Sequence, residues 1–215
     1  MEVNRREIYR YLGYGTGEPE ERVKDLTEDC IEELTRVVSP RSFTRSFPLV
    51  FLPDGSMDFT CFRVKSEHLA KNLRDCSEVI LFAASLGTGP DFLIRRYSRL
   101  EMSRAVVLQA ASAAMIEAYC NEVNAQLKKE AEGRGSYLRP RFSPGYGDFS
   151  LGYQKEICRT LSAEKTVGIT LTDSLLMLPS KSVTAVIGAG KTPCGCEPEG
   201  CENCGKTDCL YRRGQ

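Results

Sequence analysis

The sequence predicts an α+β fold, in which a mixed or antiparallel twisted sheet is flanked by helices and followed by a Cys-rich tail. Residues 102–130 carry small apolar side chains at steps of three and four, the spacing of one helix face. Residues 78–85 are a nearly unbroken apolar run, which is typical of a central strand. Five of the ten cysteines crowd the last 22 residues. We therefore expect one domain over residues 1–190 and a Cys-rich module over residues 191–215.

The composition is that of a globular protein. Apolar residues make up 41% of the 215-residue chain and charged residues 27%. The 29 basic side chains are balanced by 29 acidic ones, so net charge favours neither nucleic acid nor an anionic membrane as a partner. The first seven residues are charged where a signal peptide would be apolar, and no apolar run reaches transmembrane length. These features predict a cytoplasmic protein.

Two helices are expected near the N-terminus. Asn4 can cap a short helix that runs through Tyr11, and the glycine-rich residues 13–17 end it in a turn. Residues 19–38 place apolar side chains at helical spacing, with Pro19 in the first turn and acidic residues directly after it.

A hairpin is expected next. Residues 42–52 and 57–64 are rich in aromatic and β-branched side chains, and the sequence Pro53-Asp54-Gly55-Ser56 between them is a strong turn signal. Ser66 then suits the N-cap of another helix. After the central strand, the loop of residues 86–90 contains Gly-Thr-Gly; such a loop can receive a phosphate on its backbone amides, but a plain tight turn is the simpler interpretation.

Glu117 is the unusual residue of the long helix. Helices are expected over residues 91–97 and 102–130, and Glu117 lies on a face that is otherwise made of small residues. A carboxylate in this position needs a salt bridge, an exposed edge or a ligand. A polar connector over residues 128–136 follows. Residues 175–178 and 182–187 have the pattern of two strands, and residues 179–182 fit a hairpin between them.

The most distinctive segment is residues 139–146, Arg-Pro-Arg-Phe-Ser-Pro-Gly-Tyr. Two prolines stiffen it, and Pro144-Gly145 fits the centre of a type II turn that directs Tyr146 back toward Arg141. A guanidinium group binds a carboxylate or phosphate with two parallel hydrogen bonds, and a tyrosine offers an aromatic face and a hydroxyl. The segment therefore fits a site for a small charged or zwitterionic ligand, although a surface turn with solvated arginines is an alternative.

Arg141, Gly145 and Tyr146 resemble the Arg-x-x-x-Gly-Tyr signature of the activation domain of cobalamin-dependent methionine synthase. The run from Leu171 to Val183 is similar to that family's Leu-Thr-Glu-Ser, Met, Pro, Ser-Val run, and the helix around Glu117 resembles the family helix with a glutamate in the ligand pocket. The matches occur in the family's order over roughly residues 75–188.

The resemblance implies an activation-domain fold and a function. It implies that Arg141 clamps the carboxylate of S-adenosylmethionine, that Gly145 lets the backbone approach and Tyr146 packs on the ligand, and that Glu117 holds a polar group. The ligand would methylate cobalamin carried by a partner synthase that lacks its own activation domain, while flavodoxin or a ferredoxin-type donor supplies the electron. The chain would then be a component of a methyltransferase.

Two features depart from the family pattern. Gly135 stands where the family tends to have an acidic residue, and residues 187–190, Ile-Gly-Ala-Gly, replace an expected aromatic pair. We therefore expect a pocket that is incomplete or differently lined.

The tail contains five thiols, which suggest a metal site: Cys194, Cys196, Cys201, Cys204 and Cys209. The middle three reproduce the Cys-x4-Cys-x2-Cys spacing of plant-type ferredoxins. Spacing alone leaves an iron-sulfur cluster and zinc equally open. The family used for comparison lacks this tail.

Two rival functions remain open on sequence grounds. The chain could be an iron-sulfur protein that reductively activates another corrinoid methyltransferase, or a zinc-tailed regulatory subunit. His68 is the single histidine, so neither a Ser/His/Asp triad nor a multi-histidine metal site can be built.

Overall fold

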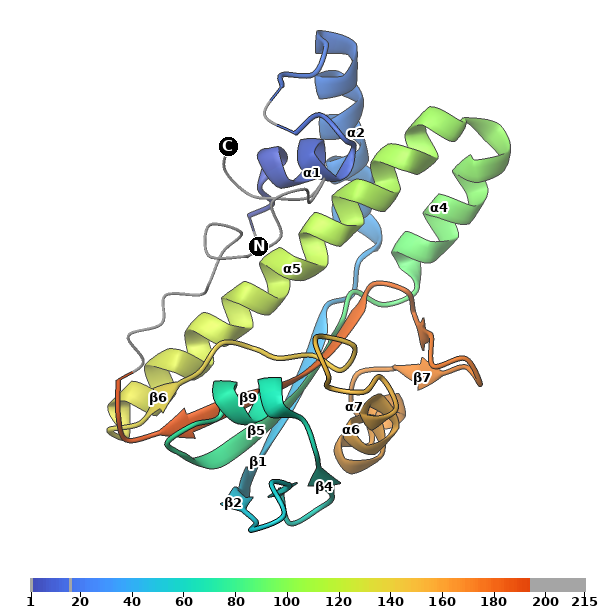
Figure 1. Cartoon of the computed structure of the whole chain (residues 1–215). Coiled ribbons are helices and arrows are strands. Elements are labelled where there is room, and N and C mark those ends of the chain that lie inside the picture. The colour runs from blue at the N-terminus through green and yellow to red at the C-terminus, as the bar shows by residue number, and fades with distance from the viewer. Residues whose placement is uncertain (1, 16, 194–215) are drawn as a thin grey trace.

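The strand β5 (Cys76–Ser85) lies inside a four-stranded antiparallel sheet. The strand order is β1 (Arg41–Pro48), β5, β9 (Ser182–Gly190) and β6 (Tyr137–Leu138). This computed structural model describes residues 2–15 and 17–193 (Figure 1). All strand pairs in the described ranges are antiparallel, so the expected α+β class is confirmed and its sheet is antiparallel rather than mixed.

Each face of the sheet carries its own hydrophobic core. Side chains alternate across a strand, so β5 contributes Ile80, Phe82 and Ala84 to one core. It contributes Val79, Leu81 and Ala83 to the other. A strand buried on both faces needs a continuous apolar run, which is why residues 78–85 could be recognised as central.

Four helices cover the first face: α1 (Arg5–Tyr11), α2 (Glu21–Val37), α4 (Gly89–Leu100) and α5 (Met102–Gly133). The long helix α5 runs diagonally across the sheet, with α1, α2 and α4 around its N-terminal half (Figure 1). Three short helices contribute to the second core: α3 (Glu67–Asn72), α6 (Tyr153–Leu161) and α7 (Ala163–Thr166).

Local capping signals were read correctly. The Asn4 side chain accepts a hydrogen bond from the amide of Arg6 at 3.0 Å, and the Ser66 hydroxyl accepts one from the amide of Leu69 at 3.0 Å. Both residues are the N-caps that begin α1 and α3. The expected first-turn position of Pro19 is wrong by two residues, because α2 begins at Glu21.

Strand pairing was predicted less well. The expected hairpin of residues 42–52 with 57–64 is reduced to a small sheet of β2 (Val50–Phe51), β3 (Met57–Asp58) and β4 (Arg63–Val64). The first of those segments supplies mostly β1, which pairs with β5 instead. Likewise β8 (Met177–Leu178) pairs with β7 (Thr170–Leu171), so the hairpin expected between residues 175–178 and 182–187 is also wrong. The polar connector was predicted to begin at residue 128, but α5 continues to Gly133 and the connector begins only after it.

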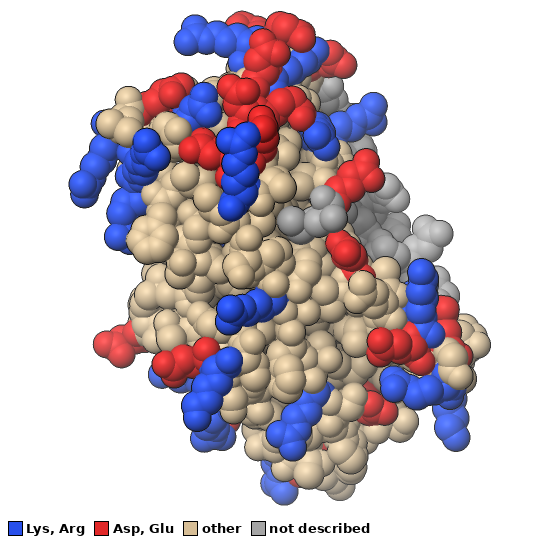
Figure 2. Space-filling model, turned by 180° about the vertical axis from the view of Figure 1, so that it is seen from behind, with Lys and Arg blue, Asp and Glu red and all other residues tan. Residues whose placement is uncertain are grey.

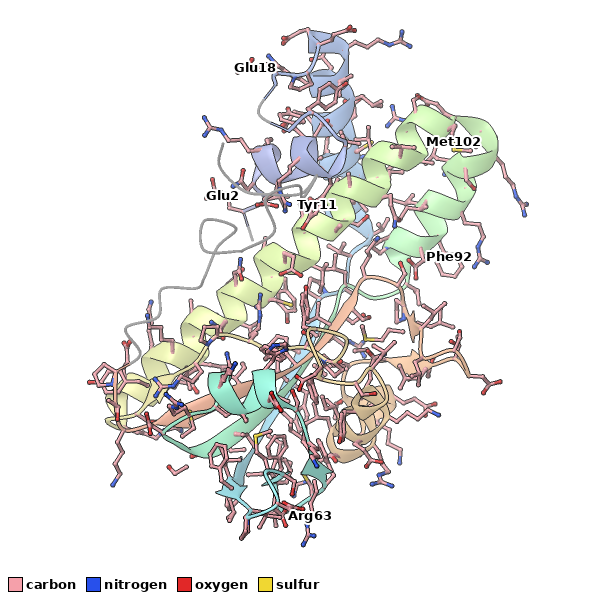
Figure 3. All side chains as sticks on the ribbon, in the orientation of Figure 1. Glu2, Tyr11, Glu18, Arg63, Phe92 and Met102 are labelled. Carbon is pink, nitrogen blue, oxygen red and sulfur yellow. The ribbon has the colours of Figure 1, made fainter. Side chains whose placement is uncertain are left out.

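The surface carries both signs of charge. Figure 2 shows basic and acidic side chains mixed toward the two ends of one face and few charges at its centre. The exposed apolar residues Phe92 and Met102 lie near the two ends of α4, with Met102 at the turn into α5 (Figure 3). No helix within residues 2–15 and 17–193 is both long enough and apolar enough to cross a membrane.

Candidate functional site

The segment of residues 139–146 lies along the edge of β9. The amide of Arg139 donates to the carbonyl of Gly188 at 2.8 Å, and Phe142 forms an antiparallel bridge with Val186. The amide of Tyr146 then donates to the Ser143 carbonyl at 3.2 Å, and Gly145 has a φ of 97°. A positive φ at the third residue of such a turn is what a type II turn requires, so the expected turn is present.

The two arginines of this segment have different environments. Arg139 is 8% exposed, and its guanidinium donates to the backbone carbonyls of Thr192 at 3.1 Å and Arg74 at 3.4 Å. Its role is therefore to hold chain segments together. Arg141 instead points toward α5, where its Nη2 donates to Asn121 Oδ1 at 2.9 Å and to Glu117 Oε2 at 3.3 Å.

The guanidinium of Arg141 is incompletely satisfied. Its Cζ lies 5.9 Å from the centroid of the buried Phe82 ring, within cation–π range. Its Nη1 is buried and has no hydrogen-bond partner in the structure. Leaving a buried charged donor without a partner costs free energy, so this guanidinium is suited to donate hydrogen bonds to an anionic ligand.

A cleft of about 200 Å³ opens beside Arg141. Its lining consists of Glu117, Arg141, Phe142, Ser143, Tyr146 and Val183. Three of the four residues expected to bind the ligand thus line one cleft, and the fourth, Gly145, forms the turn beneath Tyr146. The Tyr146 side chain is 67% exposed, so its ring is available at the mouth of the cleft.

Burial sets the protonation state of Cys120, which lies beside the cleft residues on α5. Burial raises the pKa of its thiol to about 12, against a smaller lowering by Arg141. The thiol is therefore neutral at physiological pH and contributes no negative charge near Arg141.

Asp148, two residues after the segment 139–146, joins the chain there to α3. Its carboxylate accepts hydrogen bonds from the Ser66 hydroxyl at 2.6 Å and from the amides of Glu67 at 2.6 Å and His68 at 3.1 Å. These bonds, the one from Ser66 most of all, lower the pKa of Asp148 to about 2. Gly147 next to it has a φ of 55°, and a Cβ there would lie 2.2 Å from His68 Nδ1, so a larger residue would strain the backbone and displace the His68 ring.

Residues 171–183, the second run that resembles the family pattern, reach the cleft only at their C-terminal end. Val183 lines the cleft, whereas Asp173 and Ser174 are exposed in the loop between β7 and β8. The side-chain amide of Gln154 donates to the carbonyl of Leu175 at 2.8 Å and ties this loop to α6.

The glycines that replace the expected aromatic pair are required by packing. A Cβ at Gly188 would lie 2.7 Å from Cys76 Sγ, and one at Gly190 would lie 2.5 Å from the carbonyl oxygen of Asp75. The chain therefore cannot place aromatic side chains there without moving β5.

Several residues that shape the surroundings of Arg141 were not predicted from the sequence. Asn121, Phe82 and Asp148 all act on Arg141 or on its segment. Asn121 follows Glu117 by four positions and so shares its helix face, a signal that could have identified it. Phe82 and Asp148 come from distant elements and gave no local signal.

The predicted metal site cannot be located in the part of the chain that the structure describes. Among the residues that the structure describes, no group of three or more His, Cys, Asp or Glu side chains could hold a metal ion. The five tail cysteines lie outside those residues. A larger and more open cavity of about 470 Å³ lies at α6, α7 and β7, but none of the expected ligand-binding residues lines it.

Comparison with known proteins identifies the domain. Residues 66–194, more than half of the chain, match the family described as vitamin B12-dependent methionine synthase, activation domain. Among solved structures, the chain is similar to one described as the MetH reactivation domain bound to AdoHcy, with a TM-score of 0.60 and 15% sequence identity. That similarity covers 87% of this chain and 77% of the other and shows a shared fold. None of the curated proteins matches. The chain belongs to the family of vitamin B12-dependent methionine synthase activation domains.

Proposed function

We propose that this protein binds S-adenosylmethionine in the cleft beside Arg141 and serves the reductive methylation of cobalamin on a partner methionine synthase. One observation carries the proposal: Arg141, Glu117 and Tyr146, far apart in the sequence, line a single cleft. Two comparisons support it. The family match includes all three residues, and the similar solved structure is described as bound to AdoHcy.

The cleft fits the amino-acid end of the ligand. The guanidinium of Arg141 would bind the ligand carboxylate, and Glu117, whose side chain is 47% exposed, would accept hydrogen bonds from the ammonium group. At about 200 Å³ the cleft is smaller than a pocket that encloses a whole ligand of this size, roughly 300 Å³ or more. The adenosyl end would therefore extend past the cleft mouth, where the exposed Tyr146 ring offers a stacking surface.

In this reaction the protein positions the reactants and does not act as an acid or a base. An electron from a flavodoxin or ferredoxin-type donor reduces the partner's cobalt(II) to cobalt(I). Cobalt(I) then attacks the methyl group of the sulfonium, a cobalt–carbon bond forms, and the electrons of the broken sulfur–carbon bond stay on sulfur. The products are methylcobalamin and S-adenosylhomocysteine. This chain would hold the ligand so that the methyl group on the sulfonium is accessible to the partner's cobalamin.

Calorimetric titration of the anaerobically prepared protein with S-adenosylmethionine and S-adenosylhomocysteine tests the proposal. Arg141→Ala should weaken binding by about 2–4 kcal/mol, because it removes a shielded charge partner of the ligand carboxylate. Arg141→Lys should restore only part of the loss, since a lysine lacks the planar fork. Arg134→Ala, an exposed arginine at the end of α5, is the control. No saturable binding by the parent would reject the proposal.

A second proposal concerns the tail. We propose that Cys194, Cys196, Cys201, Cys204 and Cys209 supply the ligands of a metal, either an iron-sulfur cluster or zinc. Anaerobic purification followed by iron, sulfide and zinc analysis distinguishes these outcomes, and triple replacement of Cys196, Cys201 and Cys204 by Ser should remove the metal. Iron and sulfide without affinity for S-adenosylmethionine would favour a redox activator of another corrinoid protein. Zinc without ligand binding would favour a regulatory subunit.

A further inference from the structure

The guanidinium of Arg141 has one carboxylate and two neutral side chains among its described neighbours. Asn121 Oδ1 accepts from Nη2 at 2.9 Å, and the neutral Phe82 ring lies 5.9 Å from Cζ. Within residues 2–15 and 17–193, Glu117 is the one carboxylate at ion-pair distance from Arg141, at 3.3 Å. The Arg141 side chain is 16% exposed, whereas that of Glu117 is 47% exposed and shares its charge with water.

The shorter contact to Arg141 comes from an uncharged residue. The 2.9 Å bond to Asn121 has the better hydrogen-bond distance, and the 3.3 Å contact to Glu117 is longer. Glu117 and Asn121 are four residues apart on α5, so both reach Arg141 from the same helix face. Asparagine is a weak helix former, and helix formation therefore does not account for its place in the middle of α5.

A carboxylate at position 121 would change the electrostatics without changing the shape. Asparagine and aspartate have the same size, and both can accept the hydrogen bond from Nη2. Aspartate would place a second negative charge beside one guanidinium, and the pair would no longer attract an incoming carboxylate. The amide keeps the guanidinium in place and leaves its charge available, with Nη1 still lacking a partner.

We propose that Asn121 is a positioning residue for ligand binding: it holds the Arg141 guanidinium at the cleft without neutralising it. The inference rests on the proposed function, because it assumes a ligand whose carboxylate binds Arg141. Glu117 lines the cleft, whereas Asn121 is an exposed residue outside the lining that serves as the neutral acceptor for the arginine.

The experiment compares Asn121→Asp with the parent by titration with S-adenosylhomocysteine and by thermal unfolding. We expect the dissociation constant to rise by at least about tenfold. We expect the melting temperature to stay within about 3 °C of the parent, because aspartate keeps the hydrogen bond to Arg141. Asn121→Ala should weaken both ligand binding and thermal stability. Gln126→Glu, which adds the same charge at an exposed position of α5, should bind as the parent does.

The outcomes separate the inference from the proposed function. If the parent binds S-adenosylhomocysteine and Asn121→Asp binds it within about twofold of the parent, Asn121 is only a structural hydrogen-bond acceptor and the inference is overturned. If Gln126→Glu weakens binding as much, the effect is one of general charge and the inference also fails. If the parent does not bind the ligand at all, the proposed function is rejected and the inference with it.

Discussion

Three-dimensional neighbours decide what each charged side chain does within and next to residues 139–146. Arg139 and Arg141 are two residues apart, yet the first donates to backbone carbonyls and the second to side chains of α5. The sequence shows two equivalent guanidinium groups, and only the three-dimensional neighbours distinguish them. The same holds for Asp148, a surface carboxylate whose three hydrogen bonds join the chain just after residues 139–146 to the start of α3.

The pKa of Asp148 leads to a prediction about acid stability. Because hydrogen bonds hold its folded pKa at about 2, below the ordinary 3.8, Asp148 stabilises the fold fully above its unfolded pKa. That contribution is lost as the pH falls through the folded value. Asp148→Asn should therefore be less stable than the parent at pH 7, and the difference should shrink between about pH 5 and pH 2. Urea unfolding at a series of pH values measures this.

Asp173→Asn supplies the matched control for the acid series. Asp173 is an exposed carboxylate in the loop between β7 and β8. Its replacement should leave the pH dependence of the parent unchanged. A constant difference between Asp148→Asn and the parent across the whole pH range would contradict the linkage argument.

At the scale of elements, local signals were sufficient for helices and for the central strand. Asn4 and Ser66 were recognised as caps because a cap acts within a few residues, and β5 because burial on both faces leaves a continuous apolar run. The partner of β1 could not be predicted in this way. Arg41 pairs with Ser85, more than forty positions away, and this register depends on the cores on both sides of the sheet.

Part of the cleft lining could also be predicted from the sequence, but the contacts made by distant residues could not. Residue type and family resemblance predict Glu117, Arg141 and Tyr146 as site residues, and these three line one cleft. The glycines within residues 187–190 follow from the tight contacts at Gly188 and Gly190. Those contacts come from Cys76 and Asp75, so no inspection of residues 187–190 alone could have explained the glycines.

The small residues of α5 lead to a prediction about helix packing. Ala111 is fully buried in the core that α5 shares with the sheet and with α2 and α4. Small side chains let these elements approach closely, so Ala111→Leu should overpack the core and lower the free energy of unfolding by about 1–3 kcal/mol. Ala125→Leu changes an exposed position of the same helix and should have an effect within about 0.5 kcal/mol. Equal effects in urea unfolding would show that Ala111 tolerates a larger side chain.

At the scale of the whole molecule, the described residues form two hydrophobic cores, both built from positions between Val3 and Ile187. Just past β9, the carbonyl of Thr192 accepts a hydrogen bond from the Arg139 guanidinium. A chain that ends after Pro193 keeps that carbonyl and all the described residues that line the cleft.

Truncation after Pro193 should therefore separate ligand binding from metal binding. We expect the shortened protein to bind S-adenosylhomocysteine with a dissociation constant within about threefold of the parent, because no cleft residue is removed. We expect it to contain neither iron nor zinc, since its remaining cysteines, among them Cys30 and Cys120, are scattered through the fold. Calorimetry and metal analysis on the same preparations measure both. A large loss of ligand affinity in the soluble, folded truncated protein would show that the tail takes part in the cleft. Ligand binding and metal binding would then depend on each other.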